Sequence, residues 1–143
     1  MMEPLLKLPN DKIVKEIPRL YYWLEEDGIV CSLGKKTGAT VTADETRIVL
    51  NDFEKLAGTG PGNFCLLSDL TYSAQNNIEA RKYILDRLPK MLAAFAMVTA
   101  SPTGLVVSST YLALKNTLFP VKIFDNVEEA KEWLRQHLPN KKA

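Results

Sequence analysis

The chain has 143 residues and a formal net charge of +1, with 46% hydrophobic and 24% charged residues. This length fits one domain, and the near-neutral charge differs from the clearly basic surfaces of nucleic-acid-binding domains. The run with Leu5, Leu6 and Leu8 is too short for a signal sequence, and no apolar run approaches the ~18 residues of a membrane span. We therefore expect a cytoplasmic globular domain that does not span a membrane and has no nucleic-acid partner.

The N-terminal third of the sequence predicts an arm followed by a β-hairpin. Residues 1–18 form the expected arm, in which 13–17 alternate weakly and Pro18 limits them to an edge strand. Residues 19–25 are rich in aromatic and β-prone side chains, and 29–33 form a second apolar run. The turn signal Glu26-Asp27-Gly28 between these runs predicts an antiparallel hairpin.

The rest of the chain alternates helix starts with short apolar runs. Each helix start has a capping residue followed three positions later by Glu, or Ser followed by Pro. The four starts are Thr42-Ala43-Asp44-Glu45, Asn76-Asn77-Ile78-Glu79, Ser101-Pro102 and Asp125-Asn126-Val127-Glu128. The predicted helices cover residues 43–57, 78–88, 102–115 and 127–138, and the predicted strands cover residues 63–69, 91–100 and 120–124.

This order predicts an α/β fold with a single mixed sheet of five to six strands and four helices packed on it. The hairpin supplies antiparallel strands, and the following βαβαβα order supplies parallel ones. We expect one domain over residues 19–138, after an arm at 1–18 and before a solvated tail at 139–143.

Several segments give the chain a family resemblance that covers almost its whole length. They are the Trp23-to-Ile29 hairpin, Leu66-Leu67-Ser68-Asp69-Leu70, Asn77-Ile78-Glu79-Ala80-Arg81, Ala100-Ser101-Pro102, Pro120-Val121-Lys122-Ile123-Phe124-Asp125 and Glu129-Ala130-Lys131-Glu132-Trp133-Leu134. In order and spacing, the chain resembles the SpoIIAA-like branch of the STAS superfamily, the fold of anti-anti-sigma factors, which includes many small bacterial proteins. The resemblance implies a regulatory domain that binds a protein partner.

In the signalling members of that superfamily, a serine at the start of the helix after the third strand is phosphorylated. That position falls near Gln75 or Asn76 in this chain, and neither side chain has a hydroxyl group. Thr71 and Ser73 lie close by in the sequence, and Ser73 is the nearer candidate for phosphorylation. The chain departs from the pattern at this position, so phosphorylation does not follow from the resemblance.

The loop from Asp69 to Asn77 is the best candidate for a partner-binding site. It follows a predicted parallel strand and leads into a helix start, the place where ligands of open α/β sheets gather. The candidate partner-binding residues are Asp69, Leu70, Thr71, Tyr72, Ser73, Gln75, Asn76 and Asn77. The alternative interpretation is a polar connection with a good helix cap.

Residue types that carry catalysis or bind metals are sparse in this sequence. His137 is the only histidine, and its place near a helix C-terminus favours a structural role. Cys31 and Cys65 lie in predicted strands and are expected to be buried free thiols. The acidic run Glu25-Glu26-Asp27 at a hairpin tip favours a solvated turn over an acid/base pair. We therefore expect no catalytic residues, no metal and no cofactor.

The aromatic run at the start of the hairpin has two interpretations. Strand alternation places Tyr21 and Trp23 on one face of the sheet and Tyr22 on the other. If helices cover one face only, the aromatic side chains on the other face lie on the surface or in an interface, and an uncovered aromatic patch usually marks an association site.

Three functional hypotheses follow, in order of preference. The first is a non-enzymatic regulatory or adaptor domain that binds a protein partner and forms a homodimer. The second is a carrier or sensor of a small apolar, lipid-like ligand, bound beside the uncharged helix at 102–115 and the apolar strand at 91–100. The third, a hydrolase or transferase built from Asp, Ser and Tyr side chains, has little support in the sequence.

Overall fold

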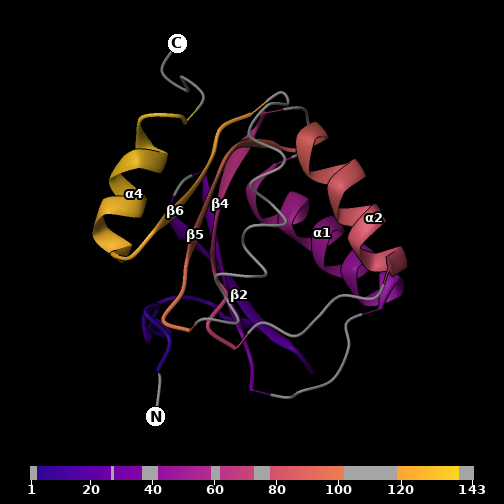
Figure 1. Cartoon of the computed structure of the whole chain (residues 1–143), viewed down its shortest axis with the longest axis horizontal. Helices are drawn as coiled ribbons and strands as arrows, with labels where there is room; N and C mark the ends of the chain where they lie inside the picture. Colours follow the sequence, from indigo (N-terminus) through magenta and orange to yellow (C-terminus); the bar gives the residue numbers. More distant parts are fainter. Residues whose placement is uncertain are drawn as a thin grey trace.

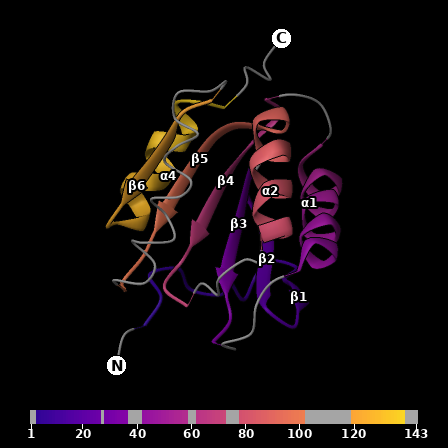
Figure 2. The same ribbon diagram turned by 45° about the vertical axis from the view of Figure 1, so that its right-hand side comes forward.

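A computed structural model describes residues 3–26, 28–36, 42–58, 62–72, 78–101 and 119–138. It contains a six-stranded sheet in which the strands lie side by side in chain order. The strands are β1 (Lys15–Ile17), β2 (Leu20–Glu26), β3 (Ile29–Gly34), β4 (Phe64–Asp69), β5 (Leu92–Val98) and β6 (Val121–Phe124). Figure 2 shows them crossing the molecule from β1 beside α1 to β6 beside α4.

The first three strands are antiparallel, and this confirms the predicted hairpin and edge strand. Strand β1 lies within the segment predicted to be an arm, so the sheet begins before residue 19. Gly28 in the hairpin turn has a φ of 86°, a conformation that favours glycine. A Cβ atom at this position would lie 2.7 Å from a methyl carbon of Leu138, so a larger residue here would force the Leu138 side chain to shift.

Strands β3 to β6 are parallel to one another, as the alternation of helices and strands predicts. Helix α1 (Ala43–Ala57) connects β3 to β4 and has the predicted bounds. Its N-cap residue is Thr42, whose side chain accepts from the backbone N–H of Glu45 while the Glu45 carboxylate accepts from the Thr42 backbone N–H. This reciprocal capping box fixes where the helix begins.

The remaining elements lie close to their predicted positions. Helix α2 (Ile78–Arg87) is followed by the short 3-10 helix η1 (Leu88–Lys90), because Pro89 cannot donate to a continued α-helix. Helix α4 (Val127–Arg135) begins at the N-cap Asn126 and ends before the predicted residue 138. The predicted helix at 102–115 and the tail at 139–143 lie outside the described residues.

Helices cover both faces of the sheet. Figure 1 shows α1 and α2 on one face and α4 on the other. Strand alternation divides the core accordingly. Tyr22 belongs to the cluster under α1 and α2, whereas Trp23 belongs to the cluster under α4 together with Leu6 of the arm. The hypothesis of an uncovered aromatic patch is therefore wrong for Trp23, which is 1% exposed.

Candidate functional site

A pocket lies between α1, α2 and the sheet, with a volume of about 150 Å³. Residues from α1, α2, η1 and the strands β1 to β5 line it, together with Arg19 in the turn between β1 and β2 and with Leu70 and Tyr72 after β4. The apolar lining residues are Ile17, Leu20, Val49, Leu50, Phe53, Leu66, Leu70, Ile84, Leu88 and Phe95. The sequence predicts a pocket lined by strand 91–100, but Phe95 is the one residue of that strand in this lining.

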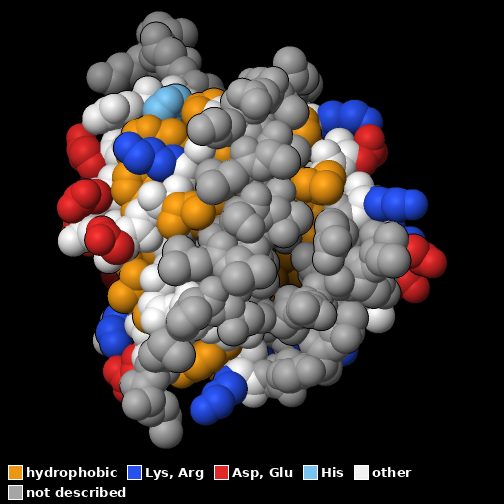
Figure 3. Space-filling view, in the orientation of Figure 1, with side chains coloured by type: hydrophobic (Ala, Val, Ile, Leu, Met, Phe, Trp, Pro, Cys, Tyr) orange, Lys and Arg blue, Asp and Glu red, His pale blue; other side chains and the backbone are white. Residues whose placement is uncertain are grey.

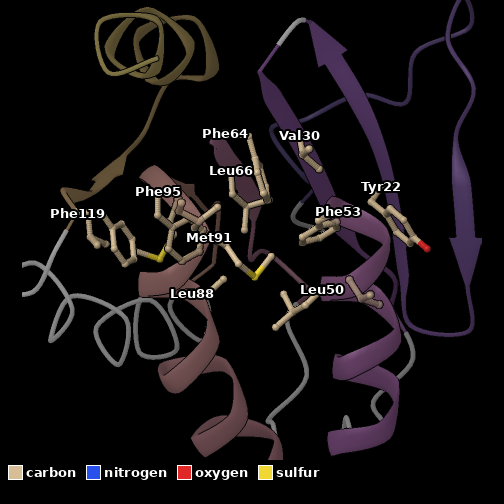
Figure 4. Close-up of a cluster of buried hydrophobic side chains, with 14 residues drawn as sticks. Tyr22, Val30, Leu50, Phe53, Phe64, Leu66, Leu88, Met91, Phe95 and Phe119 are labelled. Atoms are coloured by element: carbon tan, nitrogen blue, oxygen red, sulfur yellow. The ribbon is translucent and has the colours of Figure 1, made fainter. Parts of the chain in front are cut away.

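Apolar side chains of the lining converge from helices and strands. Figure 4 shows Leu50 and Phe53 of α1 facing Leu66 of β4, with Leu88 and Phe95 completing the cluster. Each of these five side chains is at most 4% exposed. The helices thus form one wall of the pocket and the sheet forms the other.

Polar lining residues gather where β3 and β4 end and α1 begins. The Arg19 guanidinium donates from Nε to both oxygens of Glu45, at 3.0 and 2.9 Å. Burial alone would raise the pKa of Glu45, but hydrogen bonds from Arg19 and Thr42 outweigh it and lower the pKa. Glu45 therefore remains a carboxylate beside the pocket.

Two serine hydroxyls form a second polar feature. Ser32 of β3 and Ser68 of β4 are aligned in the parallel ladder, and their Oγ atoms lie 2.7 Å apart. Both residues are 6% exposed and line the pocket. Sequence reasoning did not select them, although a lone serine in each of two apolar strands was the available signal.

The structure places Asp69, the first residue of the predicted partner-binding loop, in an internal role. It is 2% exposed, and its carboxylate accepts from three backbone N–H groups, those of Leu5 at 2.6 Å, Leu6 at 2.9 Å and Thr71 at 2.9 Å. The side chain thus points away from Ser68 and holds the N-terminal arm on the α4 face of the sheet. The arm is therefore docked on the sheet.

Thr71 is also buried and joins two loops. Its Oγ1 accepts from the backbone N–H of Ala100 at 2.9 Å, and its carbonyl oxygen accepts from Ser101 Oγ at 2.9 Å. Leu70 and Tyr72 are half-buried and line the pocket. Of the predicted site, Ser73, Gln75, Asn76 and Asn77 lie outside the described residues.

Glu25 and Glu26 do not form the expected solvated turn. Both residues belong to β2, and both pair with α4. Glu25 accepts from Lys131 Nζ at 3.0 Å and from Trp23 Nε1 at 2.7 Å, and Glu26 accepts from Arg135 Nε at 2.7 Å. Lys131 and Arg135 follow more than 100 residues later in the chain, so the local pattern could not reveal these two ion pairs.

The prediction of buried free thiols is confirmed, and His137 contacts a backbone carbonyl near the end of α4 as expected. His137 Nδ1 donates to the carbonyl oxygen of Trp133 at 2.9 Å, a structural contact at the end of α4. Cys31 and Cys65 are free and buried. Burial raises the pKa of both thiols, in Cys65 to about 12, so neither is a thiolate at neutral pH.

Within the described part of the chain, no group of three or more His, Cys, Asp or Glu side chains is arranged to hold a metal ion. Within the same residues, no helix has the length and apolar character needed to cross a membrane. Acidic side chains gather instead over the outer side of α4, at the left in Figure 3.

Comparisons with known proteins give a family and a fold. The family model described as "Domain of unknown function (DUF7793)" matches residues 22–138. The chain is also similar to the crystal structure of an uncharacterized protein from the DUF3478 family with a SpoIIAA-like fold, from Shewanella loihica PV-4. The TM-score is 0.56 at 17% identity, and the match covers 86% of this chain and 91% of that chain. No curated protein matches the sequence. The likeness shows a SpoIIAA-like fold, in agreement with the resemblance found in the sequence.

Proposed function

We propose that this chain, which belongs to the DUF7793 family, is a non-enzymatic domain that binds a small, largely apolar ligand in the pocket between α1, α2 and the sheet. The apolar lining of that pocket is the observation that carries the proposal. An engineered cavity of about 150 Å³ lined by Leu, Ile and Phe side chains binds benzene. The body of the ligand is therefore expected to be about as large as one aromatic ring.

Binding is favoured over catalysis because the carboxylates of the lining are already engaged. Asp69 accepts from three backbone N–H groups, and Glu45 accepts from Arg19 and Thr42. A general base must reach the proton that it abstracts, and neither carboxylate is placed to do so. The Ser32 and Ser68 hydroxyls bond to each other and so lack the adjacent base of an activated nucleophile.

A substitution in α1 tests the pocket. Val49 lines it and is 7% exposed, whereas its neighbour Ile48 is 55% exposed. Val49→Phe adds a ring to the pocket and is expected to abolish toluene binding, measured by NMR titration of the methyl groups of Leu50, Leu66 and Leu88. Ile48→Phe adds the same ring on the solvent side and should bind toluene as the wild type does.

Overpacking by Val49→Phe is expected to cost about 1–3 kcal/mol of stability, so both variants are first checked for cooperative unfolding. Native mass spectrometry of protein freshly purified from its own host gives a second readout. A bound small molecule that is lost in Val49→Phe would support the proposal. If toluene leaves the three methyl groups unmoved in the wild type, the ligand-binding function is wrong.

Docking of a protein partner on the loop from Asp69 onward is the second candidate function. Two observations favour it: the SpoIIAA-like fold, and the hydrogen bonds that Thr71 accepts from Ala100 and Ser101, which fix the start of the loop. The double substitution Tyr72→Ala and Asn76→Ala should abolish capture of a partner from the host while the far-ultraviolet spectrum stays unchanged. Retained capture would contradict this placement.

A cytoplasmic setting and a homodimer remain predictions, the latter checked by sedimentation.

A further inference from the structure

The polar end of the pocket contains the ion pair between Arg19 and Glu45, and Glu45 uses more of its hydrogen-bonding capacity than Arg19 does. Glu45 accepts from Arg19 Nε at both oxygens, and its Oε1 also accepts from the Thr42 backbone N–H at 3.2 Å and from Thr42 Oγ1 at 3.1 Å. The Glu45 carboxylate thus takes part in both the capping box of α1 and the ion pair with Arg19. Asp69, the other carboxylate of the lining, turns its oxygens toward the arm on the opposite face.

Arg19 keeps donors that Glu45 does not use. Among the described residues, the side-chain hydrogen bonds of Arg19 start at Nε, so the edge formed by its two Nη groups has no protein acceptor. That edge is the planar fork with which a guanidinium binds a carboxylate through two parallel hydrogen bonds. The Arg19 side chain is 20% exposed and lines the pocket, so a ligand in the pocket can reach it.

The serine pair adds a further donor at the same end. When two hydroxyls share one hydrogen bond, one of them still has its O–H hydrogen to donate. Ser32 and Ser68 are buried in the pocket lining and bond to each other, so they retain one donor for a ligand atom. Together with the Nη edge of Arg19, this gives the polar end more donors than acceptors, and the complementary head group is an acceptor.

Polar and apolar lining residues are separated along α1. Glu45 and Thr46 lie in the first turn of the helix, and Val49, Leu50 and Phe53 follow toward its C-terminus. Eight residues separate Glu45 from Phe53, which is about 12 Å at the rise of an α-helix. The pocket therefore has a polar end and an apolar end, and it fits a ligand with a head group on one side of an apolar body.

We infer that the ligand of this pocket is a small monocarboxylate whose apolar body is about the size of one aromatic ring. Its carboxylate accepts hydrogen bonds from the two Nη groups of Arg19 and from the free hydroxyl of the serine pair. The apolar body lies among Leu50, Leu66 and Leu88. The inference rests on the proposed function and names the ligand class for the same pocket. A carboxylate is favoured over a neutral acceptor because it adds the attraction between opposite charges and can accept from both Nη groups of the guanidinium at once.

Three probes that share one aromatic body test the head group. They are phenylacetate, phenylacetamide and 2-phenylethylamine, titrated at pH 7 into the full chain while the methyl signals of Leu50, Leu66 and Leu88 are followed by NMR. Phenylacetate is expected to bind at least about tenfold more tightly than phenylacetamide, a difference of one charge-assisted contact. The amine should bind most weakly.

Two substitutions that break the same ion pair form the matched control. Arg19→Gln and Glu45→Gln both remove the contact between Arg19 and Glu45. Arg19→Gln should reduce the preference for phenylacetate over phenylacetamide to about onefold. Glu45→Gln should bind phenylacetate as tightly as the wild type or more tightly, because it removes a negative charge and leaves the guanidinium in place.

Each other result has a definite meaning. If phenylacetamide binds as tightly as phenylacetate and moves the pocket methyl groups, the carboxylate inference is wrong and the binding function stands. Tightest binding of the amine, or equal losses in Arg19→Gln and Glu45→Gln, would also overturn the inference. If no probe moves these methyl groups, the proposed function and the inference fail together.

Discussion

Asp69 has a structural role among the described residues of the predicted site. Its carboxylate accepts from the backbone N–H groups of Leu5, Leu6 and Thr71, and so joins the arm, the end of β4 and the following loop. Carboxylates with several backbone donors are among the strong hydrogen-bond acceptors in proteins. Asp69 therefore holds the start of the loop in place, and its side chain does not face a partner.

Replacing Asp69 by asparagine should therefore be costly. The amide nitrogen of asparagine cannot accept, so at least one of the three backbone N–H groups loses its partner. We expect a loss of about 1–3 kcal/mol in the free energy of unfolding, measured by urea denaturation. Faster hydrogen exchange at the Leu5 and Leu6 amides should accompany it.

Asp11→Asn is the matched control in the same arm. The Asp11 side chain is 73% exposed and its one described contact is Lys12 at 3.4 Å, so its stability should stay within about 0.5 kcal/mol of the wild type. Equal effects of the two substitutions would contradict the anchoring role of Asp69.

At the scale of elements, α4 is attached to β2 by a pair of ionic contacts as well as by its buried side chains Ala130 and Leu134. Burial opposes the charged form of Glu25, but hydrogen bonds from Trp23 and Lys131 outweigh it and lower the pKa of this carboxyl. A group with a lowered pKa in the folded state contributes stability above its ordinary pKa and loses that contribution as the pH falls. The attachment of α4 should therefore weaken in acid.

A Glu25→Gln variant tests this at the level of the element. The amide still has an oxygen to accept from Trp23, so the substitution changes charge more than shape. The fall in unfolding free energy between pH 7 and pH 3 should be smaller in the variant than in the wild type. The measurement is urea denaturation followed by tryptophan emission. If the unfolding free energy falls equally in the variant and the wild type, Glu25 does not make the attachment of α4 sensitive to pH.

Elements with a complete local signal were predictable from the sequence. Thr42 and Glu45 define the start of α1, and Gly58, with a φ of 107°, defines its end, so both bounds are confirmed. The end of α4 was less well predicted, because the apolar spacing continues to Leu138 although the helix ends at Arg135. Leu138 instead packs at the hairpin turn beside Gly28, a contact that no local pattern contains.

For the whole molecule, we expect the arm and the domain to unfold as one unit. Leu6 is 5% exposed in the cluster with Trp23 and Leu67, and Asp69 holds the arm by its backbone. Removal of residues 1–12 should lower the free energy of unfolding by at least about 2 kcal/mol, through lost burial of Leu6 and unpaired oxygens on Asp69. Urea denaturation measures the loss, and a red shift of tryptophan emission should accompany it.

A double-mutant cycle separates the arm contact from other effects of the truncation. Asp69→Asn should cost less in the truncated chain than in the full chain, because the Leu5 and Leu6 donors are already absent. Additive losses would contradict the coupling between arm and carboxylate.

The candidate site was only partly accessible to sequence reasoning. The loop at Asp69 was found because it follows a buried strand, and its Leu70 and Tyr72 do line the pocket. The contact between Arg19 and Glu45 spans 26 residues, and the serine pair spans 36. Such pairs form only when β3, β4 and α1 pack against one another. The spacing of neighbouring residues in the sequence therefore cannot predict them.

The order of the strands has a consequence for synthesis of the chain. Each strand pairs with the next one along the sequence, so the sheet can extend one strand at a time as the polypeptide emerges. The arm is the exception, because its backbone donors lie 63 and 64 residues before their acceptor on Asp69. The arm must therefore wait for the synthesis of β4 before it can dock, and Leu6 stays unburied until the centre of the sheet has been made.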